Sequence, residues 1–181
     1  PAVIKGKAGS PYAIVDYYDV DPDMAVDVNK RMAEFEKLVE RTHKAGLKVV
    51  IDFVPNHVAR EYHSISCPNG IEDLGASDNK DWHFSTSNNF YYCWGHPFAP
   101  QFDIEHDSDG NPLPPYAEQP SKATGNDVFS ASPSKNDWYE TVKLNYGIDY
   151  CDAGGRSEHF YDSEGKPIVD TWFKMTEILL F

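Results

Sequence analysis

The sequence is poor in cysteine, and its few cysteines lack the close spacing of common zinc-binding and redox motifs. The 181 residues include three, Cys67, Cys93 and Cys151. None forms the C-x-x-C pair of zinc sites and thiol-disulfide motifs. The odd number leaves two interpretations open, which are one disulfide in an oxidising compartment, with Cys67 and Cys93 the nearer pair, or three unpaired thiols. The compartment itself is not fixed by the sequence, although an extracellular or periplasmic one is favoured.

Basic residues are also scarce, since 16 Lys and Arg stand against 29 Asp and Glu, for a formal net charge of -13. Nucleic acids and anionic membranes bind basic surfaces, so we expect neither as a partner, whereas an uncharged polymer is compatible. No apolar stretch approaches the roughly 18 residues of a transmembrane helix, so no membrane span is expected. A hydrophobic content of 40% and an aromatic content of 14% are typical of a globular domain.

A helix followed by a strand is the clearest local pattern. Residues 27–45 carry apolar side chains three and four positions apart, which predicts a helix with one apolar face, made of Met32, Phe35, Leu38, Val39 and Thr42. Glu40 and Lys44 form an i,i+4 pair on the other side, and Gly46 supplies a helix end. The apolar, partly β-branched run 47–54 then predicts a strand buried on both faces, hence a parallel sheet and an α/β fold.

Three polar side chains cluster near the end of that predicted strand. They are Asp52, Asn56 and His57. In α/β folds the carboxyl ends of the strands carry the active site. Asp52 shares a strand face with two valines, so we expect it to be buried and to have hydrogen-bond partners. A turn with capping hydrogen bonds is the alternative for Asn56 and His57.

From residue 58 to about 169 the helical periodicity disappears. Pro, Gly, Asn, Asp, Ser and aromatic residues dominate, which predicts a small, irregular, β-rich insertion. Within it, 107–112 and 162–167 resemble each other, and we favour hairpin turns over calcium loops because neither has the spaced ligands of such a loop. A zinc site of His57, His63 and Cys67 matches no known spacing. Of the aromatic residues Trp82, Tyr91, Tyr92, Trp94 and Trp138, at least half are expected in the core and the others could be sugar subsites.

These residues resemble the alpha-amylase superfamily (glycoside hydrolase family 13). Asp52-x-x-x-Asn56-His57 is similar to its first signature, at the end of the third barrel strand. Residues 10–18 resemble the loop after the second strand, residues 143–146 a short signature late in the inserted domain, and residues 171–180 the third barrel helix. The resemblance implies a partial (β/α)8 TIM barrel fragment with an inserted irregular β-rich domain.

The same resemblance implies a division of the chain and an incomplete fold. Residues 1–57 would be a barrel segment of loop, helix and third strand, 58–169 an inserted domain B-like region, and 170–181 the start of the third barrel helix. A full barrel takes about 250 residues, and the chain has 181, so we expect a piece of a larger enzyme. Its open sheet edges would pair with the remainder of the barrel or with a second copy of the chain.

The resemblance also assigns roles to individual residues. His57 would hydrogen-bond the 6-hydroxyl of the sugar that is cleaved, and Tyr12 would stack on the sugar ring. Asp52 would orient neighbouring groups. Asn56 lies where many members bind structural calcium. Lys143 stands where such a site usually has an aspartate, and its positive charge would oppose a calcium ion.

The implied function is retaining hydrolysis of α-linked glucans, oligosaccharide or polysaccharide. Retaining glycosidases need two carboxyl groups about 5 to 5.5 Å apart, one as nucleophile and one as acid/base. In the family these groups stand on later barrel strands, so the chain would carry no catalytic residue and be inactive alone. A transglycosylase or isomerase of the same superfamily, and a non-catalytic carbohydrate-binding module, are alternatives.

Overall fold

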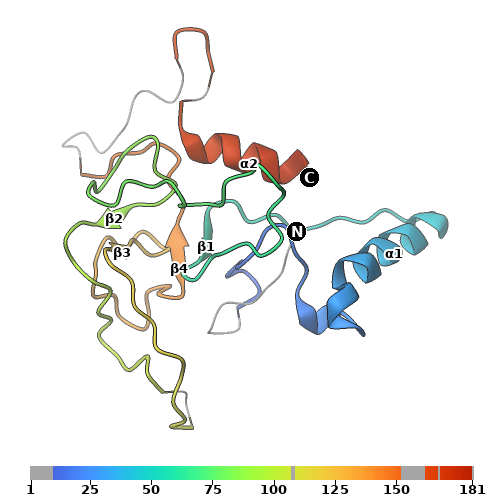
Figure 1. Cartoon of the computed structure of the whole chain (residues 1–181), viewed down its shortest axis with the longest axis horizontal. Helices are drawn as coiled ribbons and strands as arrows, with labels where there is room; N and C mark the ends of the chain where they lie inside the picture. Colours follow the sequence, from blue (N-terminus) through green and yellow to red (C-terminus); the bar gives the residue numbers. More distant parts are fainter. Residues whose placement is uncertain (1–9, 107–108, 152–161, 167, 181) are drawn as a thin grey trace.

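A computed structural model of the chain describes residues 10–106, 109–151, 162–166 and 168–180. In chain order the elements are the 3-10 turns η1 (Pro22–Met24) and η2 (Val28–Lys30), helix α1 (Arg31–Lys44), strands β1 (His57–Ala59), β2 (Tyr92–Cys93), β3 (Ser121–Lys122) and β4 (Thr141–Lys143), and helix α2 (Asp170–Leu180). Figure 1 shows the short strands in a central body, with α2 on one side and α1 extending away from it. Neither helix has the length and apolarity needed to cross a bilayer, as judged over the described residues.

The predicted first helix is present. The helical region begins with the 3-10 turn η2, which leads directly into α1. Asp27 caps η2, because its carboxylate accepts a hydrogen bond from the Asn29 N–H at 3.1 Å. Helix α1 ends at Lys44, and Gly46 follows with a φ of 76°, the left-handed conformation that glycine adopts most easily. The predicted Glu40–Lys44 pair forms at 2.6 Å.

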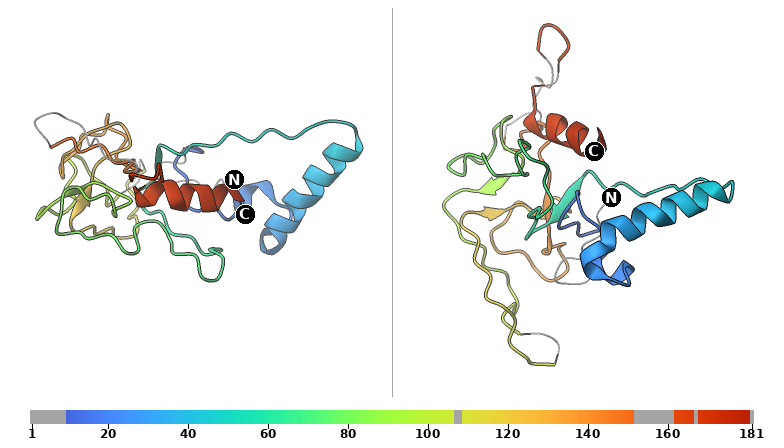
Figure 2. Two further views of the ribbon diagram at one scale, coloured as in Figure 1. Left: turned by 90° about the horizontal axis from the view of Figure 1, so that it is seen from above. Right: turned by 45° about the vertical axis from the view of Figure 1, so that its right-hand side comes forward.

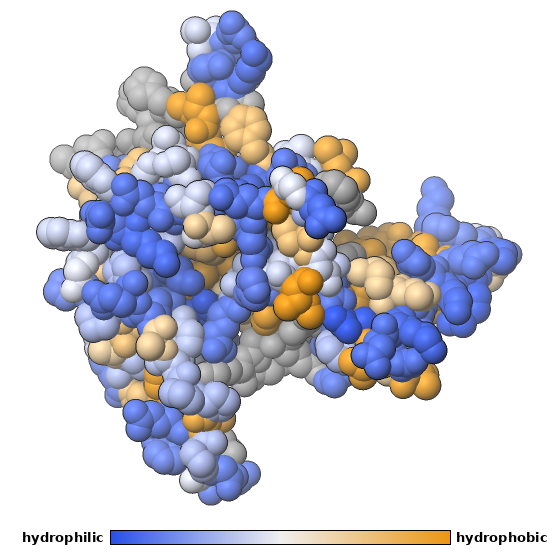
Figure 3. Space-filling view, in the orientation of Figure 1, coloured by the Kyte–Doolittle hydropathy of each residue, from blue (hydrophilic) through white to orange (hydrophobic). Residues whose placement is uncertain are grey.

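The apolar face of α1 is covered only in part by other described segments, since Phe35, Val39 and Thr42 are half-buried. None of its residues is buried, and Met32 and Leu38 are exposed. Figure 2 shows the helix as an arm that extends away from the body, and Figure 3 shows apolar side chains at the surface of this arm. The amphipathic pattern therefore predicts the helix correctly, while the surface against which such a face normally packs is supplied only in part by the described residues.

The buried parallel strand predicted for residues 47–54 is absent from the described residues. Residues 47–55 have no assigned secondary structure, and Leu47, Val50 and Ile51 are exposed. A strand needs neighbours that accept and donate its backbone hydrogen bonds, and the described residues place none beside this segment. The described strands pair antiparallel, β1 with β4 and β2 with β3, and they close no barrel.

The two small sheets are joined through β4. On one side β4 pairs with β1, with Val58 opposite Val142. On its other side Thr124 forms a bridge to Val142, and just beyond β4 Phe90 forms a bridge to Leu144, which links the segments next to β3 and β2. The core gathers around this junction and comprises Ile14, Tyr17, Val58, Leu74, Phe90, Tyr92, Val142, Leu144 and Met175. The described part of residues 58–169 is irregular, with short antiparallel strands, and none of its residues is helical.

The second predicted helix is present as α2, and polar contacts dock it onto the body. The Asn89 amide donates to the Asp170 carboxylate at 2.8 Å and accepts from Lys174 Nζ at 3.0 Å. Of the apolar side chains of α2, Met175 is buried in the core, whereas Trp172 and Leu179 are exposed. One half of the apolar face thus packs on the body and the other half faces outward.

Other sequence predictions have mixed outcomes. Cys67, Cys93 and Cys151 are all free thiols, so the Cys67–Cys93 disulfide does not form. In the second of the two similar loops, Asp162 N–H donates to Lys166 O at 2.8 Å and Gly165 has a φ of 77°, which confirms a hairpin turn there. The first loop also closes as a hairpin, with a bridge from His106 to Pro112, although residues 107 and 108 lie outside the described part.

Candidate functional site

His57 is the first residue of β1 and lies directly opposite Lys143 of β4. Its side chain is buried, with the residue only 5% exposed. A hydrogen bond joins its ring to the main chain of Tyr12, and the ring of Trp138 lies beside it, with centroids 5.4 Å apart. The structure therefore brings together the predicted His57 and Tyr12 and adds a third aromatic residue.

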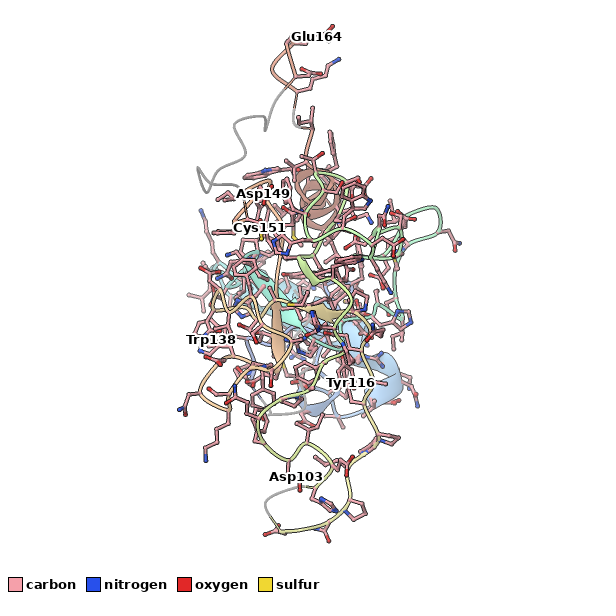
Figure 4. All side chains as sticks on the ribbon, turned by 90° about the vertical axis from the view of Figure 1, so that its left-hand side faces the viewer. Asp103, Tyr116, Trp138, Asp149, Cys151 and Glu164 are labelled. Atoms are coloured by element: carbon pink, nitrogen blue, oxygen red, sulfur yellow. The ribbon has the colours of Figure 1, made fainter. Side chains whose placement is uncertain are left out.

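Trp138 is held by its main chain while its ring stays accessible. Its N–H donates to Asn126 Oδ1 at 3.2 Å, and its carbonyl accepts from the Thr141 N–H and the Thr141 hydroxyl at 2.9 and 2.8 Å. The residue is 50% exposed, and Figure 4 shows it at the edge of the molecule. A fixed backbone with an open indole face is suited to stacking on a flat, partly apolar ligand.

The Tyr12 loop is fixed against the strand that carries His57. The Ala59 N–H donates to Ile14 O at 2.7 Å, and the His63 N–H donates to Val15 O at 3.0 Å, which ties residues 10–15 to β1 and the turn after it. Tyr12 itself is 55% exposed. Tyr12 and Trp138 are therefore both accessible, and of the two Trp138 places its ring beside the buried histidine.

The burial of His57 changes its acid-base behaviour. Removal from water is the main influence and lowers the pKa of the imidazole below its ordinary value of 6.5; the hydrogen bond to Tyr12 opposes this shift, and the charge of Lys143 adds to it. Nδ1 is buried and has no hydrogen-bond partner in the described part of the chain. At neutral pH the ring is therefore uncharged, and as a neutral imidazole it can donate one hydrogen bond and accept one.

We predict that this histidine makes the stability of the chain depend on pH. As the pH falls below about 6.5, the unfolded chain takes up a proton at His57 before the folded chain does, so the free energy of unfolding decreases, by at most about 1.4 kcal/mol per pH unit, until the lower folded pKa is passed. His57→Gln should show a smaller decrease. Urea unfolding between pH 7.5 and 5 measures both, and equal pH dependence in the two proteins would contradict the prediction.

Among the described residues, the structure shows no contact between the side chains of Asp52 and Asn56 and the site formed by His57, Tyr12 and Trp138. Both are exposed, so the expectation that Asp52 is buried with hydrogen-bond partners is wrong. The reason is the missing strand, since burial of Asp52 depends on a sheet around residues 47–54. The main-chain oxygen of Asn56 accepts from the Leu144 N–H at 3.2 Å, which holds it at the start of β1.

A calcium ion at Asn56 does not fit the residues around β4. Lys143 Nζ pairs with Asp127 Oδ1 at 2.5 Å, so the carboxylate nearest to this lysine is already neutralised by it. Calcium needs several oxygen ligands with a negative charge excess, which a lysine opposes.

The five aromatic residues of the insertion that were considered as core or sugar-subsite residues divide into buried and exposed ones. Tyr91 and Tyr92 are buried in the body, whereas Trp82, Trp94 and Trp138 are exposed, so fewer than the expected half of the five are core residues. The zinc site of His57, His63 and Cys67 is not formed, because the His63 ring lies against Asp73 at 3.2 Å and the Cys67 thiol against Ile71 O at 3.4 Å. The pairing of Trp138 with His57 has no local signal in the sequence, beyond the presence of an aromatic residue in an irregular region.

Comparison with known proteins gives one family. The family model described as the alpha amylase catalytic domain matches residues 4–109, which is more than half of the 181-residue chain. The matched residues include Tyr12 and the whole segment from Asp52 to His57, while Trp138 and Lys143 lie beyond them. No solved structure matches the chain significantly.

The chain matches only short parts of its curated relatives, which are much longer proteins. An amino acid transporter heavy chain of Mus musculus is 28% identical over 111 residues, which is 48% of this chain and 15% of that protein. Alpha-amylase MalA of Haloarcula japonica is 26% identical over 106 residues, 59% of this chain and 15% of that protein. Trehalose-6-phosphate hydrolase of Bacillus subtilis is 43% identical over 51 residues, 28% of this chain and 8% of that protein.

Proposed function

Because the chain belongs to the alpha-amylase catalytic domain family, we propose that it supplies part of the sugar-binding site of a retaining glycoside hydrolase that acts on α-linked glucans. The observation that carries this proposal is the position of His57, buried between the Tyr12 main chain and the Trp138 ring. A pyranose ring presents apolar C–H faces and polar hydroxyl edges. The accessible Trp138 ring beside a neutral imidazole matches both.

The charge of the chain suits a neutral glucan. With a net charge of -13, long-range attraction to an anionic polymer is unfavourable, whereas an uncharged sugar is not affected. The charged group that acts on His57 is Lys143, and Asp127 neutralises it. Neither provides the pair of free carboxyl groups that retaining hydrolysis requires, so we place the nucleophile and the acid/base of the reaction outside these 181 residues.

The uncovered apolar surfaces are where the rest of a barrel would pack. The exposed segment 47–51, the open face of α1 and the outward half of α2 all lack cover from described residues. Beside α2 lies an apolar groove lined by Phe53, Pro55, Tyr146, Trp172 and Leu179. We propose that the remainder of the barrel, or a second copy of this chain, pairs with segment 47–54 and covers these faces.

A non-catalytic binding or interaction module is the second candidate. The relatives include a protein described as an amino acid transporter heavy chain beside those described as hydrolases, so membership of the family alone does not imply hydrolysis. A transglycosylase or an isomerase of the same superfamily would use the same sugar site. Release of reducing sugar from starch by the longest available form of the protein would favour the hydrolase, and its absence would favour the non-catalytic module. The 181-residue chain alone should release none.

Sugar binding by the chain itself tests the site. We expect maltoheptaose to bind, and Trp138→Ala to weaken binding by about tenfold, because the loss of a stacking ring costs about 1 to 1.5 kcal/mol. Trp94→Ala is the matched control, since Trp94 is 64% exposed but has no described contact with His57. Isothermal titration calorimetry measures all three proteins. Equal weakening by the two substitutions, or no binding by the unsubstituted chain, would rule out the proposed site.

A further inference from the structure

A second cluster of reactive side chains lies apart from the His57 site. It consists of His83, Asp149 and Cys151, whose ligand atoms all lie within 4.8 Å of one another. Figure 4 shows Asp149 and Cys151 next to each other. An imidazole nitrogen, a carboxylate oxygen and a thiolate sulfur are the three ligand types that zinc accepts, and three protein ligands leave a fourth tetrahedral position for water.

The orientation of His83 is an independent observation that points to a ligand. Its Nδ1 lies 3.0 Å from the main-chain oxygen of Tyr92. A carbonyl oxygen can only accept, so Nδ1 carries the proton and Nε2 presents its lone pair. This Nε2 is buried and has no hydrogen-bond partner in the described part of the chain. Metal-binding histidines show the same arrangement, with one nitrogen donating to a backbone carbonyl and the other free for the ion.

The other two ligands come from one short segment with the right exposure. The Cys151 N–H donates to Asp149 Oδ1 at 2.9 Å, which fixes the carboxylate beside the thiol and leaves Oδ2 available. Cys151 is exposed, so an ion can reach the cluster from solvent. A thiolate and an imidazole are poor ligands for calcium and magnesium, which prefer oxygen, and good ligands for zinc.

Aromatic packing keeps the two segments together. Tyr150, between the two ligands, packs against Tyr91 with ring centroids 5.5 Å apart and against Phe129 at 4.8 Å. The His83 ring packs against the same Phe129 at 5.9 Å. The cluster is thus held by a shared aromatic wall rather than by chance approach of mobile side chains, which favours a preformed site.

We propose that His83 Nε2, the Asp149 carboxylate and the Cys151 thiolate bind one zinc ion, with the fourth position open to water. Binding releases the thiol proton of Cys151 to solvent, because zinc binds the thiolate. The site is independent of the proposed sugar function, since Asp149 and Cys151 lie beyond the residues that match the family. It is also independent of the calcium position considered at Asn56.

Metal titration of the reduced 181-residue chain tests the proposal. After removal of metal with a chelator, we expect one Zn²⁺ per chain in competition with a chromophoric zinc indicator. Co²⁺ should produce a thiolate-to-cobalt charge-transfer band, which reports sulfur in the coordination shell directly. Loss of an outer-shell partner already costs about 10- to 100-fold in metal affinity, so Cys151→Ser should weaken zinc binding at least that much and abolish the cobalt band.

Matched variants make the outcome decisive. Cys67→Ser is the control, because the Cys67 thiol donates to Ile71 O outside the cluster, and it should leave zinc affinity and the cobalt band unchanged. Cys151 is exposed, so its replacement by serine should not prevent folding, which far-UV circular dichroism verifies. Unchanged zinc affinity in Cys151→Ser, a cobalt complex without the charge-transfer band, or equal effects of the two substitutions would overturn the proposal.

Discussion

Glu118→Gln should lower the free energy of unfolding by about 3 to 5 kcal/mol, because it leaves buried positive charge without its partner. Glu118 and Arg60 form an ion pair at 2.6 Å with side chains only 7% and 4% exposed. Lys122 lies 3.4 Å from the other carboxylate oxygen. Burial lowers the pKa of Lys122, and Glu118 is the charge that opposes this shift. Glutamine keeps the shape of the side chain but removes the negative charge that two cations share.

The network also positions the candidate sugar site. Arg60 immediately follows β1, and its Nε donates to Tyr139 O at 2.6 Å, next to Trp138. Lys122 belongs to β3, and its Nζ donates to Arg60 O at 3.1 Å. Loss of Glu118 should therefore loosen the connection between β1, β3 and the loop that carries Trp138. We expect weaker maltoheptaose binding together with the lower stability.

An exposed ion pair provides the control for this prediction. Glu164 and Lys166 lie 2.8 Å apart with both side chains 70% exposed. Exposed pairs contribute little because water screens them, so Glu164→Gln should leave the urea midpoint unchanged within error. Equilibrium urea unfolding of the three proteins measures the difference. A Glu118 variant as stable as the Glu164 variant would show that the buried network does not stabilise the fold.

The helices are predictable because their signals are local. The spacing of apolar residues in α1, the Glu40–Lys44 pair and the glycine after the helix all lie within a few turns of one another, and each is present in the structure. Helix α2 follows the same rule. Local patterns do not predict which faces are covered, because that depends on elements distant in sequence.

The strand prediction is wrong for the opposite reason. Residues 47–54 have strong β propensity, but propensity becomes a strand only when other chain segments complete the hydrogen bonds. The strand that forms instead, β1, starts at His57 because β4 pairs with it there. The expected burial of Asp52 depends on the same strand and is wrong with it. The exposure of Asp52 in this chain therefore does not decide its proposed role in a complete barrel.

The site is predictable in part. The structure places the Tyr12 main chain against the His57 ring, while the sugar-binding roles that the family resemblance assigns to the two side chains stay predictions. Neither the Trp138 contact nor the cluster of His83 with Cys151 follows from spacing, because each joins residues that only the tertiary fold brings together. Long irregular segments carry few periodic signals, so their contacts are the least accessible to sequence reasoning.

Gly125→Ala should destabilise the chain by about 1 to 3 kcal/mol, because the backbone passes too close to the site to admit another carbon. A Cβ at this position would lie 2.4 Å from Thr141 Oγ1 and 3.0 Å from His57 Cβ. The Gly125 N–H donates to Thr141 O at 3.3 Å, so this segment cannot move away without loss of a backbone hydrogen bond. The clash should push His57 and the Thr141–Trp138 contact apart, and weaken maltoheptaose binding as well.

A double substitution separates this steric effect from a general loss of glycine. Thr141→Ala removes the oxygen at 2.4 Å, so the Gly125→Ala/Thr141→Ala chain should be more stable than the sum of the two single changes predicts. Gly46→Ala is the control, because Gly46 has a φ of 76° and a methyl group there would meet no heavy atom within 4 Å beyond the adjoining residues. It should lose about 1 kcal/mol through its left-handed backbone, with sugar binding unchanged. Strict additivity of the Gly125 and Thr141 effects in urea unfolding would mean that the close approach beside His57 does not determine the geometry of the site.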